Sequence, residues 1–366
     1  MKLVPSLRAM ALTGLAACGS AESQGVLKLE HKLPGGFAQL SNVVELGSGR
    51  VVFADTRSKL FLSADLATGD IDTLGTRVET ITPQSPADHY KFPGWVARLA
   101  GDTVALVDFA AQRTTLWDQQ GNALKVLGIV PAAGAAPVLV YDTVGHAYRI
   151  DYQRVLGREA GATIDPDSIA VLRIGLATGK VDTVAQLAAP EYGEAVFGEQ
   201  RQRAVKVFAP NDFFGVLPSG VAWVARGREN RVDWRDVEGS WTRGSSRKYH
   251  ALPVSQADKD RVLAQVREQG QQYGMPQELK IEYPFAATKP PFDFALSRPN
   301  GEVWLQRPRA EENAPATYDV FTQSGGWLRE VSFPDGASLA GFGKGAAIYG
   351  SIKEAQGRTV GRFVLK

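Results

Sequence analysis

The chain has 366 residues, of which 44% are apolar, so it is long enough to bury one large core or two small ones. Its 41 basic and 39 acidic residues leave a formal net charge of +2, and no basic run provides the footprint of a nucleic-acid-binding protein, so no nucleic acid is expected as a partner. The single cysteine excludes an intramolecular disulfide, so the core alone must hold the fold together.

The N-terminus has the layout of a secretion signal. Lys2 and Arg8 precede a short apolar run, Ala9 to Ala17, which is too short to span a bilayer as a helix. The run ends in Leu-Ala-Ala-Cys, and Cys18 is the only cysteine of the chain. This resembles the lipobox of bacterial lipoproteins, in which the cysteine sulfur carries diacylglycerol; the alternative is an ordinary signal peptide with an incidental cysteine.

The lipoprotein interpretation divides the chain into three parts. Residues 1–17 are expected to be the signal peptide, residues 18–25 a flexible tether, and residues 26–366 the folded domain. Acyl chains on Cys18 make the lipid bilayer a partner and place the protein in the cell envelope. Gly19, rather than Asp, follows the cysteine, which predicts the outer membrane if the host is Gram-negative.

The folded part begins with a strand pattern and then repeats a hairpin. Val26 to His31 alternate apolar with polar residues, as a half-buried strand does. Further on, Leu66–Leu74 and Leu176–Val184 share six of nine residues, each around a polar turn that ends in glycine. Equivalent turn glycines recur along the whole chain, at positions 69, 121, 179, 239 and 325.

A second set of turns gives the length of the repeated unit. These turns also end in glycine, and each precedes a short run of β-branched and aromatic residues that reads as a strand. Their glycines are Gly49, Gly101, Gly145, Gly220, Gly301 and Gly345. The two sets of turns together predict six four-stranded units of about 40 to 60 residues, the length of propeller blades.

One segment departs from this β pattern. Between the fourth and fifth units, Ser255 to Gly270 reads as a helix, with Ser255 as its N-cap, Asp258 in its first turn and Gly270 as its end. Val262, Leu263 and Val266 form a narrow apolar stripe on it. Two roles stay open for this helix: a lid over the domain, or an insertion that packs on its rim.

The sixth unit lacks its last strand, because the chain ends after the strand from Val360 to Leu365. The strand pattern at Val26–His31 supplies the missing strand and closes a ring, which pairs edges that would otherwise be free. The sequence therefore predicts an all-β fold, a six-bladed β-propeller with a short helical insertion between the fourth and fifth blades. Two stacked β-sandwiches are the alternative architecture.

At this point the chain resembles a known group, the uncharacterised six-bladed β-propeller lipoproteins of bacteria, whose fold is related to NHL-repeat and TolB-like propellers. The resemblance rests on Arg298-Pro-Asn-Gly-Glu-Val-Trp-Leu-Gln, on the segment from Tyr318 to Val331, and on Val51-Val-Phe-Ala-Asp55. NHL-type blades often carry an Asn three residues after the strand-ending Asp, whereas Ser58 and Ala111 stand here. The resemblance implies the fold and no agreed activity.

In a propeller the loops between the second and third strands, and those between blades, emerge on the same face. The long segments 76–94, 152–167, 188–212 and 253–292 all fall on this face, where binding sites are usually built. The other face carries short, glycine-tipped turns. The tryptophans fall mostly on strands and are expected to pack as wedges between blades.

The second strand of each unit ends on the loop-rich face with a characteristic residue. Around the ring these residues are Asp55, Asp108, Asp151, Arg226, Arg307 and Ser351. They predict a polarised mouth for a dipolar ligand, with Arg228 on its basic side and arginine suited to carboxylate or phosphate. The alternative is that each Asp caps its own turn.

Two functions follow from these features. The first is a lipid-anchored binding or scaffold protein without enzymatic activity. It uses the loop-rich face for an unknown protein or small-molecule partner and needs no metal or other cofactor. The second is a metal-dependent hydrolase similar to the gluconolactonase and strictosidine-synthase propellers, which use a divalent ion such as Ca²⁺. Its possible ligands are Asn42, Asn211, Asp212 and Asp293. The four histidines have no metal-ligand spacing, and no nucleophile-elbow or phosphate-loop motif is present.

Overall fold

The computed structural model describes residues 24–127, 140–151, 167–272, 275–276, 278–311 and 313–366. Strands dominate this part of the chain, which otherwise holds one α-helix, α1 (Gln256–Gln272), and a short 3-10 helix, η1 (Ala100–Asp102). The predicted all-β class is confirmed. The predicted signal peptide, Cys18, most of the tether and nearly all of segment 152–167 lie outside the described residues. No helix in the described residues has the length and apolar character needed to cross a membrane.

Four separate sheets each consist of four consecutive antiparallel strands, as the turn spacing predicted. Their strands are β2 (Val44–Glu45), β3 (Val51–Asp55), β4 (Leu60–Ala64) and β5 (Ile71–Thr73); β8 (Pro93–Arg98), β9 (Val104–Asp108), β10 (Arg113–Trp117) and β11 (Ala123–Val126); β12 (Val140–Tyr141), β13 (His146–Ile150), β14 (Ser168–Gly175) and β15 (Val181–Ala188); and β18 (Phe213–Val216), β19 (Ala222–Arg226), β20 (Arg231–Arg235) and β21 (Trp241–Thr242). Every turn glycine of the two predicted sets has a positive φ, which glycine adopts without steric cost.

A larger sheet contains the two ends of the described chain. Its eight strands are, in spatial order, β23 (Phe294–Ser297), β24 (Val303–Gln306), β25 (Thr317–Phe321), β26 (Trp327–Ser332), β1 (Gln24–Lys32), β29 (Gly357–Leu365), β28 (Ile348–Glu354) and β27 (Ala337–Phe342). β1 pairs antiparallel with β29, with Leu27 opposite Leu365, so the N-terminal strand completes the last unit. Its first residues also pair parallel with β26, which joins the last two units into one sheet.

The sheets are arranged around an axis, with the first strand of each sheet innermost. These first strands contact one another in sequence: β2 contacts β8 and β27, β12 contacts β8 and β18, and β18 contacts β23. Sheets of four antiparallel strands placed radially in this way form a β-propeller.

The hydrophobic core is divided into seams between neighbouring sheets. One seam packs Val52 and Phe61 of the first sheet against Leu106 and Trp117 of the second. Another closes the ring, because Tyr349 near the C-terminus shares a cluster with residues of the first sheet. Trp223, Trp234 and Trp304 are also buried in seams, as the wedge prediction required.

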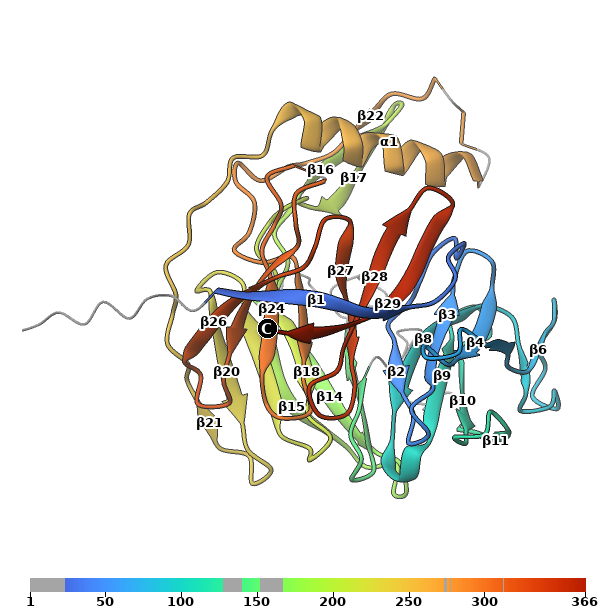
Figure 1. Cartoon of the computed structure of the whole chain (residues 1–366). Coiled ribbons are helices and arrows are strands. Elements are labelled where there is room, and N and C mark those ends of the chain that lie inside the picture. Colours follow the sequence, from blue (N-terminus) through green and yellow to red (C-terminus); the bar gives the residue numbers. More distant parts are fainter. Residues whose placement is uncertain (1–23, 128–139, 152–166, 273–274, 277, 312) are drawn as a thin grey trace, which may run out of the picture.

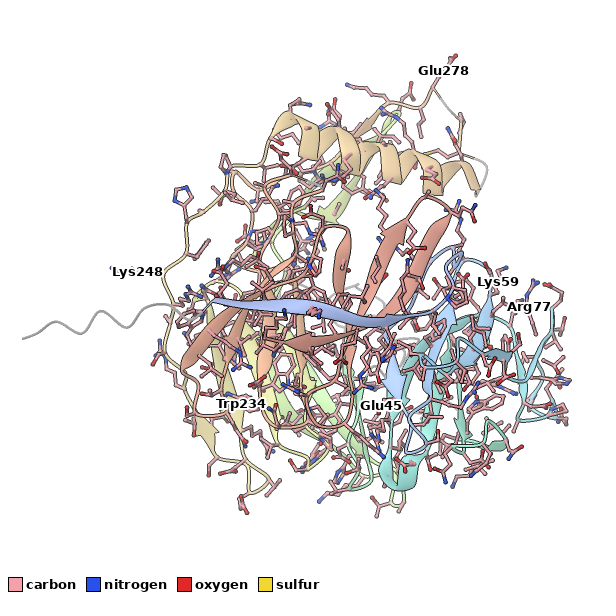
Figure 2. The ribbon with its side chains drawn as sticks, viewed as in Figure 1. Glu45, Lys59, Arg77, Trp234, Lys248 and Glu278 are labelled. Carbon is pink, nitrogen blue, oxygen red and sulfur yellow. The ribbon has the colours of Figure 1, made fainter. Side chains whose placement is uncertain are left out.

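The remaining elements stand on one face of the ring. This face, called the upper face below, carries the β3–β4, β9–β10, β19–β20 and β24–β25 turns. A small sheet of β16 (Tyr192–Phe197), β17 (Gln200–Val205) and β22 (Ile281–Glu282) lies at the same end of the molecule as α1 (Figure 1). In Figure 2 Lys59, in the β3–β4 turn, lies nearer to α1 than Glu45, at the far end of β2. β6 (Thr76–Arg77) and β7 (His89–Tyr90) form a short parallel pair beside the first two sheets.

Candidate functional site

The strand-ending aspartates hold turns on the upper face. Asp55 accepts hydrogen bonds from the backbone N–H groups of Ala38, Gln39 and Ser58, at 2.9, 3.0 and 3.2 Å. Burial acts to raise the pKa of Asp55, but these donors outweigh it and hold the pKa below its ordinary value. Asp108 repeats the arrangement with the N–H groups of residues 91, 92 and 111. Both carboxylates thus serve their own turns.

Asp151 stands at the end of β13, where its backbone N–H donates to the carbonyl oxygen of Ala170 at 2.9 Å. The next fifteen residues lie outside the described part of the chain. The structure therefore leaves the ligand-binding role predicted for Asp151 as a prediction.

The strand-ending arginines bind carboxylates of the protein itself. Arg226 donates through Nε to Asp233 at 3.1 Å and through Nη1 to Asp212 at 2.7 Å. Arg307 donates through Nε and Nη2 to both oxygens of Asp319, at 2.9 and 2.7 Å, and its Nη1 lies 2.6 Å from a carboxylate oxygen of Glu330. Their charges are already compensated, which weakens the case for a basic side of the mouth.

Arg228, the third arginine of the predicted basic side, is half-exposed. Its Nη2 lies 3.8 Å from a carboxylate oxygen of Glu191. An exposed pair at this distance contributes little to stability, ~0.2–1 kcal/mol at most. Arg228 is therefore held less closely by a carboxylate than Arg226 and Arg307 are.

Two of the four possible calcium ligands are bound to protein donors. The Asn42 amide donates to the carbonyl oxygen of Val96 at 2.5 Å and accepts from the N–H of the same residue at 3.1 Å, so it joins the first two sheets. The Asp212 carboxylate accepts from the N–H groups of Ala188 and Gly227 in addition to Arg226. No group of three or more His, Cys, Asp and Glu side chains suited to a metal occurs among the described residues. These residues, in this arrangement, do not fit a calcium site.

Asp293 differs from Asp212, although the two occupy equivalent places in a repeat. Residues 212–226 recur 81 positions later at 293–307, and both segments have the pattern Asp-Phe, then Pro-x-Gly, Trp and finally Arg. In the first copy the final Arg226 reaches back to Asp212. In the second copy Arg307 is bound to Asp319 instead. Asp293 has no hydrogen bond or ion pair to another side chain of the described chain, so its carboxylate is released from the structural role of its counterpart.

The position of Asp293 makes this carboxylate available for chemistry. It directly precedes β23, the innermost strand of the fifth unit, on the upper face, where its N–H donates to the carbonyl oxygen of Gln306 at 3.0 Å. Its side chain is exposed to solvent. The surrounding protein nevertheless raises its pKa, against the opposing charges of Arg309 and Lys289. A solvent-exposed carboxyl whose pKa is raised in this way is a candidate functional group.

The helix α1 is fixed beside this site. Ser255 and Asp258 cap its start reciprocally: the Asp258 N–H donates to the Ser255 hydroxyl oxygen, and the Asp258 carboxylate accepts from the Ser255 N–H, both at 3.1 Å. Buried Lys289 donates to Asp258 at 2.9 Å and to the carbonyl oxygen of Arg309 at 2.8 Å. Sequence reasoning missed Lys289, because nothing in its local pattern indicates a distant partner.

The other end of α1 reaches the first sheet. Glu268 lies 3.8 Å from Arg57 of the β3–β4 turn in an exposed ion pair. The helix therefore extends over the upper face from the fifth unit to the first sheet (Figure 1). Its predicted apolar stripe, Val262, Leu263 and Val266, is only half-buried.

Comparisons with known proteins find similarity in structure and none in sequence. No family model and no curated protein matches the chain. A member of the duf4221 family from Bacteroides vulgatus has a TM-score of 0.53 and 10% identity, over 93% of this chain and 98% of that one. A gluconolactonase from Xanthomonas campestris has a TM-score of 0.44 and 12% identity, over 94% and 98%. Regucalcin, a calcium-binding protein from Agrobacterium tumefaciens, has a TM-score of 0.44 and 11% identity, over 93% and 95%.

These likenesses concern the fold alone. The order of the sheets identifies that fold as a β-propeller, as the sequence predicted. Shared folds host many unrelated activities, so the chemistry has to come from the side chains of this chain.

Proposed function

We propose that the protein is a hydrolase of small lactones or esters, with its active site in the mouth of the ring at Asp293. The observation that carries the proposal is the release of this carboxylate: its counterpart Asp212 is bound by arginine, whereas Asp293 is open to solvent and surrounded by protein. A carboxyl with a raised pKa is a stronger base than an ordinary aspartate at neutral pH, which is what activation of water requires.

The reaction needs one base and one positive charge. Asp293 takes a proton from water, and the hydroxide oxygen forms a bond to the carbonyl carbon of the substrate. The carbonyl oxygen becomes an oxyanion, which the positive charge of Arg309 stabilises. The bond from this carbon to the ring or ester oxygen then breaks, and the leaving oxygen takes the proton that Asp293 held. The products are a hydroxy acid from a lactone, or an acid and an alcohol from an ester.

Whether the activity needs Ca²⁺ has to be decided by experiment. The side-chain oxygens of Asn42 and Asp212 are bound to N–H donors, so an ion at the four residues Asn42, Asn211, Asp212 and Asp293 requires their rearrangement. Regucalcin, one of the structural neighbours, is a calcium-binding protein, so the ion is worth testing. The steps above are written without it.

The test is an assay of the purified full chain against a panel of lactones and aryl esters by pH-stat, with EDTA or with added Ca²⁺. We expect hydrolysis by the wild type and a loss of at least ~100-fold in kcat for Asp293→Asn. The matched control is Asp335→Asn, which removes an exposed carboxylate from the loop before the sixth unit. Hydrolysis that Asp293→Asn leaves intact, or none on any substrate in either condition, overturns the proposal.

The proposal also covers the architecture and the location of the protein. The ring is a six-bladed propeller in which α1 is inserted between the fourth and fifth blades, supported by the order of strands and by the seams between them. Acylation of Cys18 holds it in the cell envelope, at the outer membrane of a Gram-negative host, supported by the N-terminal sequence. A partition assay in detergent tests the anchor: wild type enters the detergent phase, and Cys18→Ser does not.

A further inference from the structure

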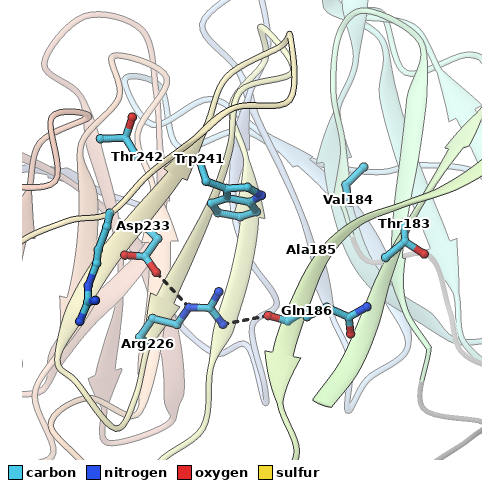
Figure 3. A pocket seen from close by; sticks show the side chains of 9 residues that line it. Thr183, Val184, Ala185, Gln186, Arg226, Asp233, Trp241 and Thr242 are labelled. Carbon is cyan, nitrogen blue, oxygen red and sulfur yellow. Dashed lines mark hydrogen bonds and ion pairs between the residues drawn. The ribbon is translucent and has the colours of Figure 1, made fainter. Parts of the chain in front are cut away.

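A groove lies between two neighbouring sheets, and Asp293 is not among its lining residues. The groove has a volume of about 430 Å³ and lies between β15 of the third sheet and β20–β21 of the fourth (Figure 3). Val184 and Ala185 contribute to it from β15, and Arg226, Asp233 and Trp241 from the fourth sheet. Its volume falls within the usual range of small-molecule pockets, ~300–1,000 Å³.

The groove exists because the outer strand of the fourth sheet is short. β21 has two residues, whereas the corresponding β15 has eight. The chain leaves the sheet at Gly244, whose N–H donates to Asp233 at 3.1 Å, and Ser245 then donates to the carbonyl oxygen of Gly325 in the fifth sheet at 3.1 Å. Lys248 marks this departing segment at the edge of the molecule in Figure 2. The space beside β15 is therefore not covered by a strand of similar length.

Trp241 gives the groove an aromatic wall. It is 42% exposed, whereas Trp223, Trp234 and Trp304 are buried in the seams between sheets. The prediction that the tryptophans act as wedges therefore does not extend to this residue. An exposed indole in a concavity offers a flat apolar surface, on which planar rings stack well.

Arg226 gives the groove a donor. Its Nε and Nη1 bind Asp233, Asp212 and the carbonyl oxygen of Gln186, but its Nη2 makes no hydrogen bond to the described residues and is not enclosed. Figure 3 shows this third nitrogen on the side of the guanidinium that faces Trp241. Because two of the three nitrogens are occupied, the bidentate fork that arginine offers to a carboxylate is not available here, and the contact is a single-nitrogen one.

The charges of the groove indicate the sign of its ligand. Exposed Arg243 adds a positive charge to the lining, whereas the charge of Arg226 is compensated by Asp212 and by Asp233, the one carboxylate of the lining. That carboxylate accepts hydrogen bonds from Arg226, Arg231 and Gly244, so it is saturated. Burial acts to raise the pKa of Asp233, but the bonds from Arg231 and Arg226 outweigh it and lower the pKa, which keeps the group ionised.

We infer that this groove is a binding site for a flat, apolar carboxylate. The ring of the ligand lies against Trp241 and the floor formed by Val184 and Ala185, and one carboxylate oxygen accepts from Nη2 of Arg226. The inference does not rest on the hydrolase proposal, because no residue of the groove belongs to the mouth at Asp293.

The test uses 2-naphthoate and its neutral isostere 2-naphthamide as probes. Calorimetric titration of the full chain in detergent, with the detergent alone as blank, measures both affinities. We expect naphthoate to bind at least 5-fold more tightly than naphthamide. Trp241→Ala, which removes the wall, and Thr183→Trp, which fills the groove from an exposed position, are each expected to weaken naphthoate binding at least 10-fold without changing Tm.

Two controls locate the site. Val181→Ala removes an exposed apolar side chain from the same strand β15 outside the groove, and Asp293→Asn alters the mouth; both are expected to bind naphthoate as the wild type does. Equal affinity for the two probes, no naphthoate binding, unchanged binding in Trp241→Ala and Thr183→Trp, or lost binding in either control overturns the inference. Arg226→Ala is not used, because it also breaks the pairs with Asp212 and Asp233.

Discussion

At the scale of single residues, the surroundings of a carboxylate decide its role. Asp55, Asp108 and Asp212 stand on the same face and are bound by backbone N–H groups or by arginine. Asp293 has the same chemistry and an equivalent place in a repeat, but the arginine that would bind it faces elsewhere. Sequence reasoning grouped Asp212 with Asp293 because both lie near the start of an innermost strand. It could not separate them, because the direction of a guanidinium depends on the strand beside it.

This contrast makes a prediction for Asp293→Asn and Asp212→Asn. The folded-state pKa of Asp293 is raised, so the ionised form is disfavoured in the fold and costs stability above that pKa. Asp293→Asn removes the cost, and we expect its Tm at pH 7 to equal or exceed that of the wild type. Asp212→Asn leaves a partly buried Arg226 without its closest carboxylate and is expected to lose about 3 kcal/mol.

Thermal and urea unfolding of both variants at pH 7 measure the difference. The two substitutions are chemically identical, so only their surroundings distinguish them. If Asp293→Asn is destabilised as much as Asp212→Asn, Asp293 has a structural role. That outcome contradicts the proposal that Asp293 acts as the catalytic base.

At the scale of elements, the sequence predicted those features that depend only on residues close together in the chain. The helix from Ser255 was predicted from its cap, and α1 begins one residue later with that cap in place. The turn glycines were predicted because a positive φ is a property of one residue. The β16–β17 hairpin and its pairing with β22 were not predicted, because β22 lies more than 80 residues along the chain from β16 and its two residues carry no pattern.

The attachment of α1 makes a pH-dependent prediction. Burial acts to raise the pKa of Asp258, but the hydrogen bonds from Lys289 and Ser255 outweigh it and hold the pKa well below the ordinary value of 3.8. A carboxyl with a depressed folded-state pKa contributes stability that is present above its unfolded pKa and is lost as the pH falls toward the folded one. Acidification below about pH 4 should therefore loosen α1 from Lys289.

Asp258→Asn tests this link. The variant leaves the buried Lys289 ammonium without its carboxylate, so we expect lower stability at pH 7 and a shallower loss of Tm between pH 5 and 3 than in the wild type. Asp260→Asn, on the exposed side of the same helix turn, is the matched control and should follow the wild type. Hydrogen exchange over residues 256–266 shows whether the helix itself loosens. Parallel pH profiles for Asp258→Asn and the wild type contradict the link.

At the scale of the whole molecule, β1 closes the ring by pairing with β29, the last strand of the described chain. The incomplete last unit implied that a strand is missing, and the alternating pattern at Val26–His31 identified the segment that supplies it. The added parallel pairing with β26 was not foreseen, because it arises only once β1 lies between two sheets. The Asn42 bridge between the first two sheets is likewise a product of the ring.

Leu27→Ala tests whether this closure stabilises the entire ring. Leu27 is 2% exposed in the seam between the last two units, opposite Leu365, whereas its neighbour Val26 is 59% exposed on the same strand. Removing a buried leucine side chain costs about 2–5 kcal/mol, and removing an exposed valine costs little. If β1 closes the ring, all the sheets unfold together and the lost stability affects the whole domain. We therefore expect Leu27→Ala to lower the temperature of one cooperative transition. Val26→Ala is expected to unfold as the wild type does. Calorimetry of both variants distinguishes the cases: a separate low-temperature transition in Leu27→Ala, with the main transition unmoved, means that β1 detaches alone and the other sheets stand without it.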